Sequence, residues 1–303
     1  MINRIFYFLK PLLPRPGQIA VRRWLIRRKL PRVANVWPID ESSSRLPHGW
    51  EGWPNGKQFA LVLTHDVDTQ RGQERCRDLA ALEADYGFRS SFNFVPERYK
   101  VSEDLRDYLT SAGFEVGVHG LLHDGKYFNS RDFFRERAQR INRYIREWGA
   151  AGYRSPSMLR NMKWFHDLDI RYDASTFDTD PFEPDPEGVG TIFPFWVESE
   201  TPGKGYMELP YTLPQDFTLF ILMKNTGIDI WKKKLDWIAK HGGMALLNVH
   251  PDYMAFGGKI GLEEYPARYY SDFLQHVKSA YGDTFWPAIP REMAAFMRGW
   301  AGR

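Results

Sequence analysis

The sequence has a single cysteine, Cys76, among 303 residues, so no disulfide can form within the chain. This favours a reducing compartment or a protein that is indifferent to redox conditions. No stretch approaches the roughly 20 consecutive apolar residues that a membrane-spanning helix needs. Hydrophobic residues make up 43% of the chain and charged residues 26%, which excludes whole-chain disorder and predicts a large core.

Several catalytic signatures are also missing. The chain contains no GxSxG elbow, no GxxxxGK[ST] loop, no GxGxxG after a strand and no paired CxxC. Cys76 lies in a charged helical stretch, ERCRDLAAL, and is expected to pack or to lie at the surface rather than to act as a nucleophile.

Acidic residues are scarce at the N-terminus. Residues 1–40 hold nine Lys and Arg and one acid, so this arm carries a net charge of +8 and the remainder −5. Residues 18–29 place Trp24 and Ile26 among four arginines, and a basic helix of this kind can lie in an anionic membrane surface. Residues 1–35 are therefore expected either to contact such a surface or to pack on the barrel or a partner chain. Nucleic acid is not expected, because no recognition motif accompanies the charge.

The apolar run at residues 5–9 is stopped by Lys10 and Pro11, so no secretory signal is predicted. The expected location is cytoplasmic. The basic arm suggests in addition a peripheral attachment to the inner face of the membrane.

The remaining chain alternates between strand-like and helix-like segments. Residues 1–57 are interpreted as the arm and a linker rich in Pro, Gly, Ser and Trp, and residues 58–303 as one domain with C-terminal helices. Strands are predicted at 59–64, 90–95, 114–119, 152–154, 191–197 and 244–249. Helices are predicted at 73–86, 103–112, 131–148 and 228–241. This alternation indicates parallel pairing and a β/α layout.

Polar clusters follow the predicted strands. They are THDVD at 64–68, HGLLHD at 119–124, RSPS at 154–157, Asp173, and HPD at 250–252. In a parallel α/β barrel the strand C-termini open on one face, where active sites lie. Five clusters in that position therefore predict one shared site.

One interpretation of these clusters is a metal site. His119 and His123 are four residues apart, so on one helical turn they would share a face and could bind one ion. A carboxylate from Asp66 or Asp68 would complete the ligand set, and the other could act as a base. Gly120 stands where a zincin protease needs Glu, which disfavours that class. Taken singly, a histidine pair or a capping Asp is more often structural.

The other clusters suggest supporting roles. Arg154 could pair with the base and hold it ionised. His250, at the end of an apolar strand, could be the general acid for a departing nitrogen. Asp173 could orient that histidine and keep it protonated.

The order and spacing of the clusters resemble the polysaccharide deacetylase superfamily, also called family 4 carbohydrate esterases. The motifs of that family are T-F-D-D, H-S/T-x-x-H, R-x-P-Y, D-x-x-x-W and L-x-x-x-H. The similar segments here are THDVD at 64–68, HGLLH at 119–123, RSPS at 154–157, DASTF at 173–177 and LLNVH at 246–250. All five occur in the family's order.

The resemblance implies an α/β fold, a distorted (β/α) barrel of seven or eight strands, here with a basic N-terminal extension. It implies a metal-dependent hydrolase that removes an N-acetyl or other N-acyl group from an amino sugar in a polysaccharide or lipid-linked glycan. Carried over by position, the ligands of one divalent metal ion would be Asp68, His119 and His123. Zinc suits these ligands best, although cobalt, nickel or manganese could also bind.

The resemblance also assigns catalytic roles. Asp66 would be the base, positioned by Arg154, and His250 would be the acid, tuned by Asp173. Because Val67 separates the two aspartates, the choice between Asp66 and Asp68 as metal ligand stays open at this point.

Three further positions would contact the substrate. The backbone N–H of Ser157 would help to bind the oxyanion, Leu246 would line a pocket for the acyl methyl group, and Phe177 would form a groove wall. Ser157 replaces the family's Tyr, Phe177 replaces its Trp, and Gly120 lacks the usual hydroxyl. These departures bear on the identity of the substrate more than on the reaction.

Two alternatives remain. One is an amidohydrolase or deformylase for a small metabolite, which a narrow pocket would favour. The other is an inactive glycan-binding protein. At least one side chain of the shared site would then point away from it, among Asp66, Asp68, His119, His123 and His250. The acidic, proline-rich segment 177–190 is expected to form a loop near the site.

Overall fold

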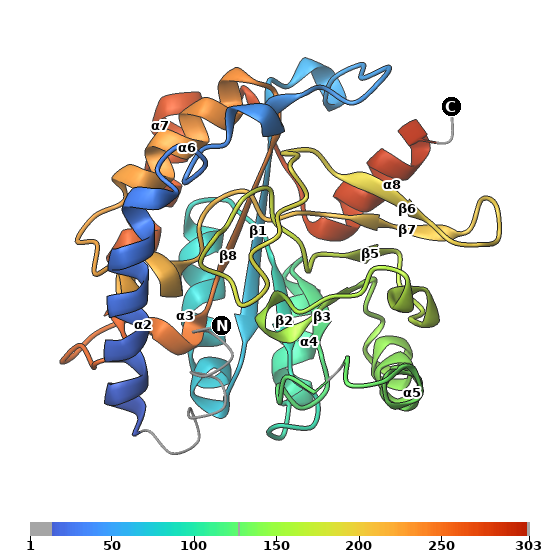
Figure 1. Ribbon diagram of the computed structural model, residues 1–303, viewed down its shortest axis with the longest axis horizontal. Coiled ribbons are helices and arrows are strands. Elements are labelled where there is room, and N and C mark those ends of the chain that lie inside the picture. The colour runs from blue at the N-terminus through green and yellow to red at the C-terminus, as the bar shows by residue number, and fades with distance from the viewer. Residues whose placement is uncertain (1–13, 127, 302–303) are drawn as a thin grey trace.

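The computed structural model describes residues 14–126 and 128–301, and its centre is a curled sheet (Figure 1). The order is β11-β1-β2-β3-β4-β5-β7-β6. Strands β11 and β2 pair with the first and last residues of β1 along one edge, and β8 pairs with its other edge. The nine strands are β1 (Phe59–Val67), β2 (Ser91–Phe94), β3 (Glu115–His119), β4 (Gly152–Arg154), β5 (Tyr172–Asp173), β6 (Phe195–Glu198), β7 (Gly205–Glu208), β8 (Met244–Val249) and β11 (Phe285–Pro287). Every pair is parallel except β6 with β7. A separate parallel pair joins β9 (Met254–Ala255) and β10 (Tyr265–Pro266).

The sheet closes into a distorted barrel through an irregular segment after β7. Leu213 forms a parallel bridge with Leu247 of β8, and the amide of Thr212 donates to the carbonyl of Leu246 over 3.0 Å. The α/β barrel predicted from the sequence is therefore confirmed.

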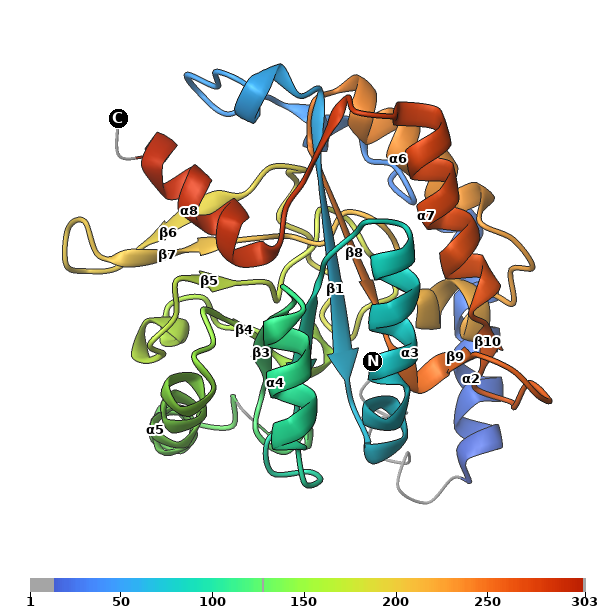
Figure 2. The ribbon, with the colours of Figure 1, turned by 180° about the vertical axis from the view of Figure 1, so that it is seen from behind.

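Helices surround the barrel, as Figures 1 and 2 show from opposite sides. They are α3 (Gln70–Asp85), α4 (Glu103–Ser111), α5 (Arg131–Trp148), α6 (Asp229–Lys240), α7 (Arg268–Tyr281) and α8 (Pro290–Ala301). The shorter helical turns are η2 (Leu30–Arg32), η3 (Glu41–Ser44), η4 (Pro54–Gly56), η5 (Pro156–Met158), η6 (Trp164–Asp167), η7 (Phe217–Leu222) and η8 (Pro251–Tyr253). Among the described residues, no helix is long and apolar enough to cross a membrane.

Helix α5 shows how the sequence determines where a helix begins and ends and which face it buries. The Ser130 hydroxyl accepts from the Phe133 amide at its start, and Gly149 ends it in the left-handed region at φ 61. Its buried residues recur at helical spacing and form one stripe that packs on the barrel, and this stripe includes Arg137. Arg135, Arg143 and Arg146 are exposed. The bounds of α5, β4 and β8 match the prediction, whereas only residues 195–197 of the strand predicted at 191–197 join the sheet, as part of β6.

The basic arm forms helix α2 (Arg15–Lys29), which packs against the barrel beside η7. Ile19 and Ile26 are buried, and the Arg23 side chain donates to the carbonyl of Ile221 over 2.9 Å. Packing on the barrel, one of the two expectations for this arm, is what the described part shows. Residues 1–13 lie outside the described residues.

The segment between β5 and β6 is anchored by a buried ion pair. The Lys234 ammonium of α6 donates to Asp178 over 2.9 Å, and both side chains are buried. Burial raises the pKa of Asp178 to about 6, even though Lys234 opposes the rise. This pair holds the segment that carries Glu183 and Pro184 to the functional cavity, so the predicted loop does lie near the site.

We expect Lys234→Ala to lower the free energy of unfolding by about 3–5 kcal/mol, because it leaves a buried carboxylate without its partner. Denaturant unfolding measures this. The exposed Lys233→Ala is the matched control, with a change within about 0.5 kcal/mol. Equal stability of the two variants would contradict the anchoring role.

Candidate active site

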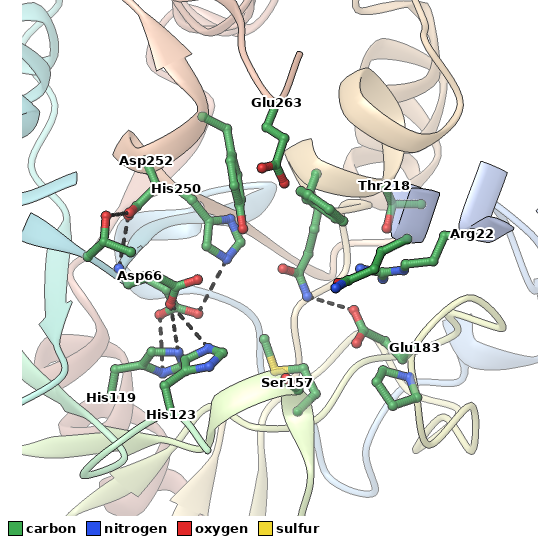
Figure 3. Close-up of a pocket in the computed structure, with 18 of the residues that line it drawn as sticks. Arg22, Asp66, His119, His123, Ser157, Glu183, Thr218, His250, Asp252 and Glu263 are labelled. Carbon is green, nitrogen blue, oxygen red and sulfur yellow. Dashed lines mark hydrogen bonds and ion pairs between the residues drawn. The ribbon is translucent and has the colours of Figure 1, made fainter. Parts of the chain in front are cut away.

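The carboxyl ends of the parallel strands surround a cavity of about 530 Å³ (Figure 3). Five of the residues predicted to share a site line it, namely Asp66, Asp68, His119, His123 and His250. The expectation that one side chain would point away, made for an inactive glycan-binding protein, is therefore not met.

Strand periodicity explains the first cluster. Alternate residues of a strand point to opposite faces, so Asp66 and Asp68 both reach the cavity although Val67 separates them. His65 points the other way and pairs with the buried Glu83 of α3 over 2.8 Å. Within the THDVD segment, His65 thus has a structural role.

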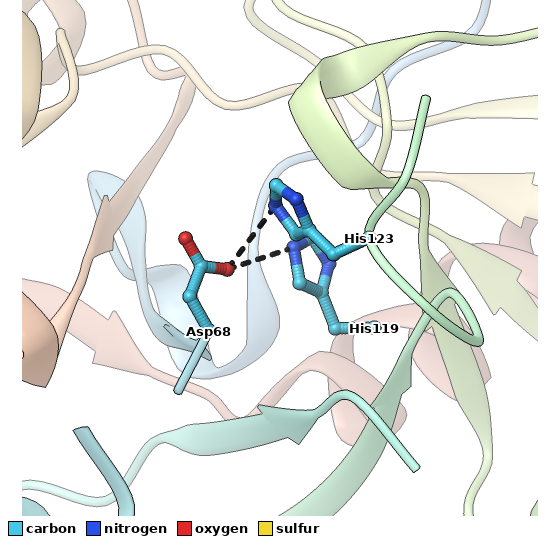
Figure 4. Close-up of side chains that lie close together, drawn as sticks. All are labelled: Asp68, His119 and His123. Carbon is cyan, nitrogen blue, oxygen red and sulfur yellow. Dashed lines mark ion pairs between the residues drawn. The ribbon is translucent and has the colours of Figure 1, made fainter. Parts of the chain in front are cut away.

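Asp68, His119 and His123 form a group that could hold a metal ion (Figure 4). Asp68 Oδ1 lies 3.4 Å from His119 Nε2 and 3.3 Å from His123 Nε2. The donor atoms of all three residues lie within 4.8 Å of one another. Asp68 Oδ1 is buried and has no hydrogen-bond partner in the described chain, which an ion would supply. The donor set of one carboxylate and two imidazoles suits a divalent ion such as zinc.

The two histidines meet through a turn. His119 ends β3, whereas His123 lies in a loop where Gly120 has φ 63 and His123 has φ 55. The helical turn expected between them is wrong, because positive φ at both positions folds the chain back instead. His119 Nδ1 lies 3.1 Å from the Arg154 carbonyl, and a proton donated there leaves Nε2 free as a ligand.

Asp66 is held from several sides. Asn93 of β2 donates to Oδ1 over 3.1 Å, and Asn248 of β8 donates to Oδ2 over 2.9 Å. Arg154 Nη1 lies 3.6 Å from Oδ1 and donates to the Thr64 hydroxyl over 3.0 Å. Burial would raise the pKa of Asp66, but the charges of His119, Arg154 and His250 lower it. Asp66 is therefore an oriented, ionised carboxylate, which a general base requires.

A glycine makes room for this arrangement. Gly117 of β3 is the register partner of Asn93, and a Cβ at Gly117 would come within 2.1 Å of the Asn93 Oδ1 atom. The sequence analysis missed Asn93 and Asn248. The position of Asn248, two residues before His250 on the same strand face, was the available signal.

His250 is paired with Asp216. His250 Nδ1 lies 2.7 Å from Asp216 Oδ1, and the His250 amide donates to Oδ2 over 2.8 Å. Burial alone would lower the pKa of His250, but Asp216, with Asp68 and Asp66, raises it to about 10. His250 Nε2 lies 4.0 Å from Asp66 Oδ2. A protonated histidine thus stands beside an ionised carboxylate in one cavity.

The predicted contact of Asp173 with His250 is wrong. Asp173 accepts from the amide and hydroxyl of Ser175, over 2.9 and 2.7 Å, and it neighbours Arg154 and Glu208. The reason is topological: Asp173 lies on β5, between β4 and β7, whereas Asp216 lies in the segment beside β8. Residues 211–216 contain no apolar run that would predict a strand, so the sequence did not indicate Asp216 as a site residue.

The three predicted substrate contacts have different positions. Ser157 lines the cavity, exposed and in the left-handed region with φ 57. Leu246 and Phe177 are fully buried in the core and do not line the cavity, so their predicted contacts are corrected. Leu246 lies two residues below Asn248 on β8, and Phe177 packs against Tyr211 with ring centroids 5.2 Å apart.

Comparisons with known proteins find the fold. No protein-family model matches the sequence, and no curated protein matches it. A structure from Mycobacterium smegmatis, named as a polysaccharide deacetylase, has 19% identity and a TM-score of 0.64, covering 84% of this chain and 96% of that one. The Puue allantoinase has 16% identity and a TM-score of 0.63, covering 87% and 98%. A Pseudomonas aeruginosa PAO1 protein, also named as a polysaccharide deacetylase, has 15% identity and a TM-score of 0.57, covering 80% and 92%.

The chain thus has the fold of the polysaccharide deacetylases, as the five motifs predicted. At identities below 20% the likeness establishes the fold. The same fold carries an allantoinase, so the chemistry has to be argued from the residues of the cavity.

We expect Asp216→Asn to lower the pKa of His250, since losing an adjacent opposite charge shifts a pKa by about 1–3 units. An acid must be protonated to act, so the alkaline limb of kcat/KM for a reaction in which His250 is the acid would move to lower pH. Asp173→Asn is the control and should leave the limb in place. An unshifted limb in Asp216→Asn would contradict the pairing.

Proposed function

We propose that this protein is a metal-dependent hydrolase that removes an N-acetyl or other N-acyl group from an amino sugar. The observation that carries the proposal is the meeting of an ionised Asp66 and a protonated His250 beside the group of Asp68, His119 and His123. Amide hydrolysis needs a base for the attacking water and an acid for the departing nitrogen. This cavity supplies both next to a metal-ligand set.

In this proposal Asp68, His119 and His123 hold a divalent ion, and Asp66 is the base. The bound ion would supply Lewis-acid activation of the amide carbonyl and of water. Asp66, oriented by Asn93 and Asn248, accepts a proton from the attacking water.

The remaining steps use groups on the other sides of the cavity. His250, kept protonated by Asp216, gives its proton to the nitrogen as the C–N bond breaks. The products are a free amine and a carboxylate. The Ser157 amide is the proposed donor to the developing oxyanion.

Two structural neighbours named as polysaccharide deacetylases support an amino sugar as the substrate class. The second candidate is hydrolysis of a small cyclic amide or ureide, which the likeness to an allantoinase favours. The intact pair His119 and His123 supports metal-dependent chemistry for either substrate.

The test is release of acetate from N-acetylglucosamine and its oligomers by zinc-supplemented protein, with allantoin as the competing substrate. His119→Ala/His123→Ala should reduce kcat/KM by about 10³ or more, since the ion contributes several kcal/mol to the barrier. His48→Ala is the control, because His48 lies far from the cavity in sequence and is not among its lining residues. Hydrolysis of allantoin without acetate release would support the second candidate, and full activity of the double variant would contradict metal dependence.

We also propose that α2 contacts an anionic membrane surface, since its outward face carries Trp24, Arg27 and Arg28. Trp24 is 46% exposed, and the Arg28 guanidinium lies 4.0 Å from its ring centroid. A ring and basic side chains on one exposed face are typical of interfacial helices.

Sedimentation with vesicles that contain anionic phosphatidylglycerol measures this contact. Each basic residue near such a surface contributes about 1 kcal/mol, so Arg27→Gln/Arg28→Gln should weaken partitioning about 30-fold. The control is Arg143→Gln/Arg146→Gln on α5, where both side chains are exposed. Equal partitioning of both variants and the unaltered protein would exclude α2 as the contact.

A further inference from the structure

Arginines from three elements line the active-site cavity: Arg15 and Arg22 of α2, Arg71 of α3, and Arg98 after β2. Two of them have carboxylate partners. The Arg15 side chain donates to Glu263 over 2.7 Å, and Arg71 lies 3.7 Å from a Glu264 oxygen.

Arg22 and Arg98 differ from those two. Within residues 14–126 and 128–301, no carboxylate forms an ion pair with either. A guanidinium that lines a cavity without a neutralising carboxylate is available to an anionic ligand.

The guanidinium of Arg22 packs over one aromatic ring. Its guanidinium carbon lies 4.9 Å from the ring centroid of Phe217. The Phe217 ring lies 4.8 Å from Tyr253, and Tyr253 lies 5.2 Å from the ring of His250. Arg22 is thus linked to the proposed acid through the tilted ring contacts of Phe217 and Tyr253. Figure 3 shows Arg22 extending from α2 into the cavity.

Glu183, which also lines the cavity, is an acidic side chain that interacts electrostatically with Arg22. Gln215 donates to Glu183 over 2.8 Å, and Tyr211 lies 3.0 Å from the same oxygen. Burial, and then repulsion from Asp180, raise the pKa of Glu183 to about 8. Arg22 opposes this rise without reversing it, so burial disfavours the charged form of Glu183 that would neutralise Arg22.

Arg98 contributes from another side of the cavity. It is exposed and follows β2, and it interacts electrostatically with His123. The cavity therefore has a positive group on the side of His250 and another on the side of the metal-ligand group. Both line the cavity that holds the proposed reacting groups.

We propose that the substrate carries an anionic oxygen group, a phosphate or a carboxylate, next to its N-acyl sugar, and that Arg22 binds this group with Arg98 as a second contact. The inference rests on the proposed deacylation and adds the charge of its substrate. Arginine matches phosphate and carboxylate oxygens through paired N–H donors. Helix α2 would then be one wall of the active site, and the basic arm would act in specificity.

Calorimetric titration of the zinc-supplemented full chain tests this without relying on turnover. The ligands are N-acetylglucosamine, which is neutral, N-acetylglucosamine 1-phosphate and N-acetylmuramic acid, which carries a carboxylate. We expect at least one anionic sugar to bind about ten-fold more tightly than the neutral sugar, and the stronger of the two identifies the anion.

The variants Arg22→Gln, Arg98→Gln and their combination should reduce that preference, with most of the loss in Arg22→Gln. Arg27→Gln, on the exposed face of the same helix, is the matched control and should keep the full preference. Because Arg98 is exposed, Arg98→Gln remains informative even if Arg22→Gln destabilises α2. The inference is overturned if neither anionic sugar binds more tightly, or if the preference persists in the double variant.

Acetate release separates this outcome from the proposed function. Equal turnover of neutral and anionic sugars, unchanged in the double variant, would overturn the inference and leave the deacylase proposal intact. Arginine-dependent binding of anionic sugars with no acetate released would overturn the deacylase proposal and support only the anion site.

Discussion

The burial of one carboxylate, Asp66, at the end of the central strand constrains the rest of the site. An ionised carboxylate away from water is costly unless hydrogen bonds and opposite charge compensate it. The compensation comes from two of the strands paired with β1: Asn93 is the register partner of Asp66 on β2, and Asn248 reaches it from β8. The site therefore requires parallel pairing in this register. It also requires glycine at position 117, because a Cβ there would clash with the Asn93 side chain.

Charge alternates outward from this point. Arg154 and His250 lie on two sides of Asp66, and each is backed by acidic groups, Asp173 near Arg154 and Asp216 on His250. The Asp173 side also includes Glu208, whose pKa is raised well above its usual range by burial and then by Asp173. A divalent ion at Asp68 fits this pattern, because it would place positive charge beside the second aspartate. Burial raises the pKa of Asp173 as well, so the charges next to the reacting atoms are those of Asp66, Arg154 and the pair of His250 and Asp216.

The sequence was sufficient where local pattern and topology agree. The apolar run of β1, the stripe of α5 and the polar residues after successive strands predicted the barrel and a shared site.

The sequence did not predict contacts that depend on how distant segments pair in the folded chain. Asp216 lies in a segment whose only strand-like feature is a bridge to β8, so nothing local marked it as the partner of His250. The spacing of His119 and His123 suggested a helical turn, whereas positive φ at Gly120 produces the same convergence by another route. Position in a family motif placed Leu246 and Phe177 at the substrate, yet both lie in the core.

The most direct test of the account is anomalous diffraction at the zinc absorption edge from crystals of the full chain grown with zinc. The account predicts a peak about 2.0–2.2 Å from one ligand atom each of Asp68, His119 and His123, with Asp66 still hydrogen-bonded to Asn93 and Asn248. A zinc ion bound by Asp66 in place of Asp68 would contradict the division of roles between the two aspartates. The absence of any peak within reach of the two histidines would contradict the metal site itself.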